Sequence, residues 1–172
     1  MPVVGLWKEI KYILGEVNSY NQIQPMSRTS SLHHIVINTY CRRMTIDPKN
    51  EEHLYRYIWK FLTEQQCRLL RIGGIANHLH ILIDLHPTVS MAKLMENMKR
   101  NSSMWMKKSG MFPLFEGWGK EYFSFSKSQE EKEKIIKYIM NQKEHHLTNT
   151  FEDELKTIIR EEKMEWDDLL LT

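Results

Sequence analysis

The stretch Asn77-His78-Leu79-His80-Ile81-Leu82-Ile83 decides the fold that we predict for this sequence. Successive side chains of a β-strand point to opposite faces of a sheet, so the two histidines would share one face. The other face would carry the apolar residues Leu79, Ile81, Ile83 and Leu85. We therefore predict a strand with one face in the hydrophobic core and two imidazoles, able to hold one cation, on the other.

Hydrophobic periodicity and turn residues on either side of this stretch predict the remaining elements. Ser128 and Glu131 form the capping-box pattern that opens a helix containing Tyr138. Strands are expected at 33–40, 68–75, 78–85 and 122–125, and helices at 6–17, 51–66, 90–108, 128–142 and 151–163. One antiparallel sheet with helices packed on it, an α+β architecture, accounts for this order of elements.

The length of 172 residues indicates one main domain with short additions. We expect an N-terminal amphipathic helix and linker over 1–31, the domain over 32–150 and an acidic helical tail over 151–172. No apolar run approaches the ~18 residues of a membrane span, and no secretion signal is evident. Cys41 and Cys67 lack the spacing of a zinc or disulfide motif, so we predict a cytoplasmic protein without a membrane partner.

Charge is divided unevenly along the chain. Residues 1–120 contain 16 Lys and Arg against 9 Asp and Glu, whereas residues 151–172 contain 3 against 8. The predicted helix at 90–108 is markedly basic, and a basic helix can bind the phosphates of a nucleic acid. The candidate phosphate-binding residues are Lys93, Lys99, Arg100, Lys107 and Lys108. The alternative is that these charges only keep a helix face solvated.

The chemistry would come from the two histidines together with Tyr138 and Gln142. Residues four apart on a helix share a face, so the Tyr138 phenol and the Gln142 amide would lie side by side. Two imidazoles need a third ligand, and the Gln142 oxygen could supply it for Mg²⁺ or Mn²⁺. Tyr138 could then attack a phosphodiester as a nucleophile. Taken singly, His78 and His80 could be surface or core histidines, and Tyr138 could pack at the edge of the core.

These motifs, in this order and spacing, resemble the single-tyrosine HUH transposases, the small enzymes of minimal bacterial insertion sequences and their REP-associated relatives. The resemblance extends from about His33 to Phe151, leaves out the first thirty residues and fades in the acidic tail. It rests on His78-Leu79-His80, the Tyr138/Gln142 helix and the segments 123–128 and 141–146. Asn77 is a departure, since many relatives have Asp before the first histidine.

The resemblance implies a ferredoxin-like antiparallel sheet in an intertwined, obligate homodimer, with the tyrosine on a mobile helix that can serve the partner's site. It implies that Tyr138 nicks and rejoins single-stranded DNA next to hairpins through a 5′-phosphotyrosine, with Mg²⁺ or Mn²⁺ held by His78, His80 and Gln142. Two alternatives stay open: a hairpin-binding descendant without chemistry, and a metal-dependent phosphodiesterase that activates water. The neutral Asn77 and the extra N-terminal helix favour the hairpin-binding alternative.

Overall fold

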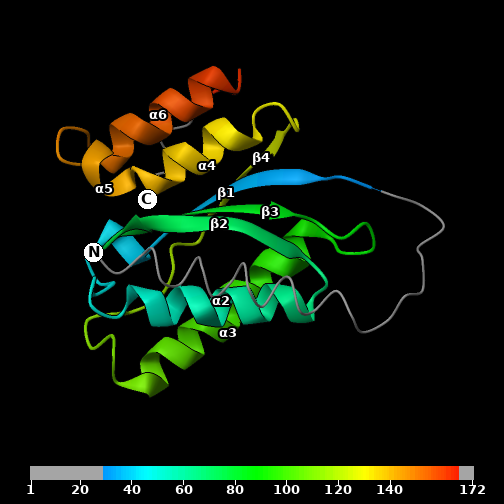
Figure 1. Cartoon of the computed structure of the whole chain (residues 1–172). Coiled ribbons are helices and arrows are strands. Elements are labelled where there is room, and N and C mark those ends of the chain that lie inside the picture. Colours follow the sequence, from blue (N-terminus) through cyan, green and yellow to red (C-terminus); the bar gives the residue numbers. More distant parts are fainter. Residues whose placement is uncertain (1–28, 167–172) are drawn as a thin grey trace.

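The computed structural model describes residues 29–166 (Figure 1). The helix that we predict at 6–17, and residues 167–172 of the predicted tail, lie outside the described residues. The strands are β1 (Leu32–Asn38), β2 (Arg68–Ile75), β3 (His78–Asp84) and β4 (Phe123–Lys127). The helices are the short 3-10 turn η2 (Tyr40–Arg42), α2 (Glu51–Glu64), α3 (Met91–Ser109), α4 (Lys132–Met140), α5 (Gln142–His145) and α6 (Phe151–Glu161).

The four strands form one sheet in the order β2-β3-β1-β4, and every neighbouring pair is antiparallel. From β1 to β4 the chain follows the β-α-β-β-α-β order of ferredoxin-like folds. The predicted α+β fold, an antiparallel sheet with helices packed on it, is therefore confirmed. Because β1 and β3 occupy the centre of the sheet, the histidines of β3 lie at the middle of the domain.

α2 and α3 cover one face of the sheet (Figure 1). The apolar residues of β3 and β1 on this face are at most 1% exposed: Ile35, Ile37, Leu79, Ile81 and Ile83. The helices contribute apolar residues at helical spacing to the same core, among them Leu54, Ile58, Leu62, Leu94, Met95 and Met98. The alternation in β3 that predicted a half-apolar strand is confirmed, although its other face is also covered.

α4, α5 and α6 cover that second face (Figure 1). α6 packs Phe151, Leu155, Ile158 and Ile159 against Val36, Phe123 and Phe125. α4 packs Ile135 and Ile139 against Leu82 of β3. The two helices leave a strip of three buried polar side chains between these apolar contacts: His34, His78 and His80, which are 4%, 0% and 0% exposed.

The start of α4 follows the predicted capping box. The backbone N–H of Ser128 donates to Oε2 of Glu131 at 2.8 Å, and the backbone N–H of Glu131 donates to Oγ of Ser128 at 3.3 Å. The end of α4 differs from the prediction, because Asn141 leaves the helical conformation (φ −95°, ψ 11°) and Gln142 begins α5. In the described part of the chain, no helix has both the length and the apolar character needed to cross a membrane.

Candidate active site

β3 supplies the two histidines, and the surrounding elements bury both completely. Nδ1–H of His78 donates to Oδ1 of the preceding residue, Asn77, at 2.7 Å. With its proton on Nδ1, the imidazole turns a bare Nε2 toward the helices. Oε1 of Gln142 and Oε2 of Glu154 each lie 3.3 Å from this Nε2. Burial lowers the pKa of His78 to about 4, so the ring is neutral near pH 7 and can act as a ligand.

His80 is positioned by a third buried histidine. Nδ1 of His80 lies 2.9 Å from Nε2 of His34 on β1, and the two rings stack with centroids 5.1 Å apart. Burial lowers the pKa of His34 well below its usual value, so this ring too is neutral. Nε2 of His80 lies 3.3 Å from the carboxylate of Glu154. Both imidazoles of β3 therefore aim Nε2 at the same point, and each is held at Nδ1 by a neighbour.

Glu154 on α6 is the hub of the site, and its side chain is only 1% exposed. Nε2 of Gln142 donates to Oε1 at 2.7 Å, and Nε2 of His146 donates to Oε2 at 3.0 Å. The hydroxyl of Tyr138 also donates to Oε1. Burial would raise the pKa of Glu154, but the contacts with His146, His78 and His80 together outweigh burial and hold that pKa well below the usual range. The carboxylate is therefore ionised.

His146 is the cationic member of this group. Its Nδ1–H donates to the carbonyl oxygen of Asn149 at 2.8 Å while Nε2–H donates to Glu154, so both ring nitrogens carry protons. Burial opposes this charge, yet the two hydrogen bonds raise the pKa of His146 above its usual value. The preceding residue, His145, instead lies beside the ring of Tyr138, with the two ring centroids 5.7 Å apart.

The nucleophile candidate lies next to the histidine pair of its own chain. The ring of Tyr138 meets the ring of His80 edge-on, with centroids 5.6 Å apart. Burial and the charge of Glu154 raise the pKa of Tyr138 well above its usual value, so the phenol is protonated. α4 and α5 thus bring Tyr138 and Gln142 to the site as the sequence spacing predicts, despite the break at Asn141.

The donor atoms suit a divalent cation. In an octahedral site with bonds of ~2.1 Å, neighbouring ligand atoms are ~3.0 Å apart. The separations of 3.3 Å from Nε2 of His78 to Gln142 and to Glu154 are close to that value. His78, His80 and Glu154 form a buried group whose ligand atoms lie within 4.8 Å of one another. Two imidazole nitrogens, an amide oxygen and a carboxylate match Mn²⁺, and the two oxygen donors also suit the harder Mg²⁺.

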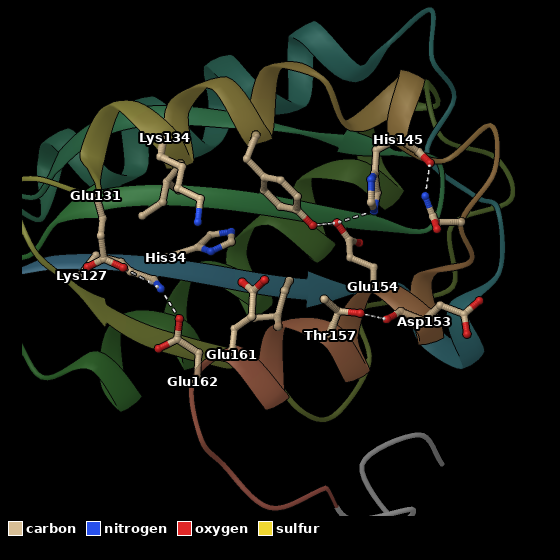
Figure 2. Close-up of a pocket in the computed structure, with 14 residues that line it drawn as sticks. His34, Lys127, Glu131, Lys134, His145, Asp153, Glu154, Thr157, Glu161 and Glu162 are labelled. Carbon is tan, nitrogen blue, oxygen red and sulfur yellow. Dashed lines mark hydrogen bonds and ion pairs between the residues drawn. The ribbon is translucent and has the colours of Figure 1, made fainter.

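A cleft of about 600 Å³ between α4 and α6 reaches Tyr138 and Glu154 from outside (Figure 2). Lys127 and Lys134 line one side of it, and Lys127 is bound to Glu162 and Glu131. The carboxylates in its lining are more numerous than the lysines: Glu131, Asp153, Glu154, Glu161 and Glu162. The entrance to the tyrosine is therefore acidic on the α6 side.

The predicted phosphate-binding residues lie on α3, on the opposite face of the sheet (Figure 1). Nζ of Lys99 donates to the backbone carbonyl oxygens of Lys120 and Glu121, at 2.7 and 3.1 Å. Lys93 and Arg100 both pair with Glu96. Lys107 and Lys108 are exposed in the last turn of the helix. The structure thus does not bring the basic helix together with Tyr138.

Sequence reasoning missed Glu154 and the role of His34. Glu154 lies between Phe151 and Leu155 on the apolar stripe of α6, where it is buried. A carboxylate on the buried face of an amphipathic helix needs a polar partner, and that position was the available signal. His34 likewise shares the face of β1 that carries Val36, although no spacing in the sequence links it to His80.

Comparison with known proteins gave one family and several structures. A model of the family described as "Transposase IS200 like" matches residues 27–142. A crystal structure of a candidate transposase from Deinococcus radiodurans R1 matches with a TM-score of 0.55 and 17% identity, covering 71% of this chain and 98% of that chain. A structure of a REP-associated tyrosine transposase bound to a REP hairpin matches with a TM-score of 0.54 and 13% identity, covering 72% of this chain and 74% of that chain. A search of curated protein sequences found no match.

The fold and the pattern of candidate site residues together define a class of protein. An antiparallel sheet carrying a His-x-His pair, covered by a helix with a tyrosine, is the arrangement that the resemblance to single-tyrosine transposases implies. The likeness to the two structures, at under 20% identity, supports the fold alone. The family model spans more than half of the 172 residues. The chain belongs to the IS200-like transposase family.

Proposed function

We propose that this chain is a metal-dependent DNA strand transferase that nicks and rejoins single-stranded DNA next to hairpins. The observation that supports the proposal most is the convergence of a tyrosine hydroxyl, two imidazoles and an amide oxygen around one buried point. This is the set of groups that a phosphoryl transfer to tyrosine requires. The similar structure bound to a REP hairpin supports a DNA hairpin as the ligand.

Tyr138 would be the nucleophile. Its hydroxyl must lose its proton as the oxygen attacks the phosphorus of a phosphodiester, because the raised pKa keeps the resting phenol neutral. The new bond is a 5′-phosphotyrosine, and the leaving group is the 3′-oxygen of the cut strand, which takes up a proton. A later attack by a 3′-hydroxyl on the same phosphorus would release Tyr138 and rejoin DNA.

His78, His80 and Gln142 would hold Mg²⁺ or Mn²⁺. When bound, such an ion polarises the phosphate and stabilises the charge that develops on its oxygens. Asn77 and His34 would keep Nε2 of each imidazole aimed at the ion through their contacts at Nδ1. We propose a homodimer as the working form, on the basis of the resemblance. The ring of Tyr138 lies beside the ring of His80 of the same chain, and this contact supports a nucleophile that acts at its own chain's site.

A cleavage assay tests the proposal. A single strand with a REP-type hairpin and flanking bases should yield a denaturant-resistant protein adduct with Mg²⁺ or Mn²⁺, and none with chelator. His78→Ala and His80→Ala should lose the adduct and retain hairpin binding, because these residues hold the ion and do not read DNA. A binding defect as large as the cleavage defect would contradict their assignment as ligands.

A hairpin-binding protein without chemistry is the second candidate, and one observation favours it. Glu154 accepts a hydrogen bond from the hydroxyl of Tyr138, and the charged residues that line the cleft leading to this pair are mostly carboxylates, which repel phosphates. Under this alternative the same oligonucleotide binds tightly, and no adduct forms with either ion over a range of hairpins and flanking sequences.

A further inference from the structure

We infer that Glu154 is an anionic ligand of the metal in this chain, alongside His78, His80 and Gln142. The inference rests on the metal site of the proposed function and adds a residue that lies outside the segment matched by the family model, 27–142. Glu154 comes from α6, which begins nine residues after that segment ends.

The first argument is the convergence of three atoms that can each donate an electron pair. Nδ1 of His78 lies 2.7 Å from Oδ1 of Asn77, and this contact leaves Nε2 facing the helices. Oε1 of Gln142 and Oε2 of Glu154, both electron-pair donors, lie 3.3 Å from it. A divalent cation placed among the three would be attracted to each of them.

The second argument is the placement of the carboxylate. Burial of an ionised carboxylate is unfavourable unless partners compensate for the lost water. His146 supplies one positive charge, and the hydroxyl of Tyr138 and the amide of Gln142 supply neutral hydrogen bonds. The side of the carboxylate that faces His78 and His80 lies 3.3 Å from Nε2 of each ring. That side is where a divalent cation would add the missing compensation.

The third argument is rigidity. The residues flanking Glu154 on the buried stripe of α6 are Phe151, Leu155 and Ile158, and they pack against β1 and β4. The N-cap Thr150 fixes the start of the helix by accepting the backbone N–H of Asp153 at 3.1 Å. A ligand on a packed and capped helix is preorganised for its ion. Binding of the ion and docking of α6 should therefore stabilise each other.

The test is direct binding of Mn²⁺, measured by calorimetry on the full chain without DNA. Glu154→Gln keeps the shape of the side chain and removes its charge, and Glu161→Gln is the matched control, because Glu161 is exposed on the same helix. The dissociation constant should rise at least about tenfold in Glu154→Gln and stay within about twofold in Glu161→Gln. Amide hydrogen exchange in α6 should slow on addition of Mn²⁺ to the wild type, and should not respond in Glu154→Gln.

Two results would overturn the inference while leaving the proposed function intact. One is that Mn²⁺ binding is lost in His78→Ala but is unchanged or tighter in Glu154→Gln. The other is faster exchange in α6 on addition of Mn²⁺, which would mean that the ion displaces the carboxylate. Failure of the wild type to bind Mn²⁺, or equal binding by His78→Ala, would instead contradict the metal site of the proposed function, and the inference with it.

Discussion

Oδ1 of Asn77 lies 2.7 Å from Nδ1 of His78, and this contact determines which nitrogen of the imidazole is free. An acceptor at this position fixes the tautomer and the orientation of a metal-binding histidine, and a carboxylate does so more strongly than an amide. The departure from Asp to Asn at position 77 therefore changes the strength of this contact and not its presence, because the amide oxygen makes it. A residue at position 77 without a side-chain oxygen would remove the contact with Nδ1 of His78.

Substitutions at Asn77 test the orientation of His78 without changing any of the proposed metal ligands. Asn77→Leu should lower Mn²⁺ affinity by about 10- to 100-fold, the usual cost of losing such a partner. Asn77→Asp should raise the affinity, because a negative charge makes His78 a stronger donor. Titration of each purified variant with Mn²⁺ measures both effects, with circular dichroism as the check on folding. Equal affinities in all three proteins would show that the contact at Nδ1 does not matter.

At the scale of elements, α4 can pack closely against β2 because Gly73 has no side chain. A Cβ on this residue would lie 2.8 Å from the carbonyl oxygen of Ile139, which real structures essentially never show. Backbone cannot yield as the end of a flexible side chain can. The helix that carries Tyr138 would therefore have to move if the glycine were replaced.

Gly73→Ala should displace α4 and reduce adduct formation by at least tenfold, with a loss of about 1–3 kcal/mol in stability from overpacking. Gly110→Ala is the control. Gly110 caps α3 with φ 71° and has open space around it, so alanine there costs roughly 1 kcal/mol without touching the site. Urea unfolding and single-turnover cleavage should show both variants destabilised and only Gly73→Ala slow. Equal cleavage rates would show that the position of α4 tolerates the change.

The elements themselves were largely predictable, and the candidate site only in part. The alternation in β3 and the capping box at Ser128 are local patterns, and local patterns are what a sequence displays. The pairing of His34 with His80 depends on the register between β1 and β3, which only the folded sheet specifies. Glu154 depends on the return of α6 across the sheet: its position on the apolar stripe of the helix predicts burial, but nothing local in the sequence identifies the histidines that it meets there.

At the scale of the whole molecule, the basic helix and the tyrosine lie on opposite faces of the sheet (Figure 1). Contacts between α3 and phosphates would then contribute affinity without taking part in the reaction. Lys107 and Lys108 are the better test of this role, because Lys99 is bound to backbone carbonyl oxygens and Arg100 to Glu96.

The double variant Lys107→Ala/Lys108→Ala should weaken binding of hairpin and unrelated strands alike. The slope of log affinity against log salt should fall by up to about 2, since each neutralised phosphate contributes just under one unit. The single-turnover cleavage rate at saturating DNA should stay unchanged. A slope equal to that of the wild type would place the DNA elsewhere, with this end of α3 facing solvent or a partner chain.

The central claim is that Tyr138 becomes covalently joined to DNA, and mass spectrometry of the trapped adduct tests it most directly. The wild type is incubated with a hairpin strand and Mn²⁺, the complex is denatured, and both components are digested. We predict one modified peptide, which contains Tyr138 carrying the 5′-phosphate of the residual nucleotide, and no such peptide from Tyr138→Phe. Modification at another residue, for example Tyr122, or cleaved DNA without any modified peptide, would contradict the assignment of Tyr138 as the nucleophile.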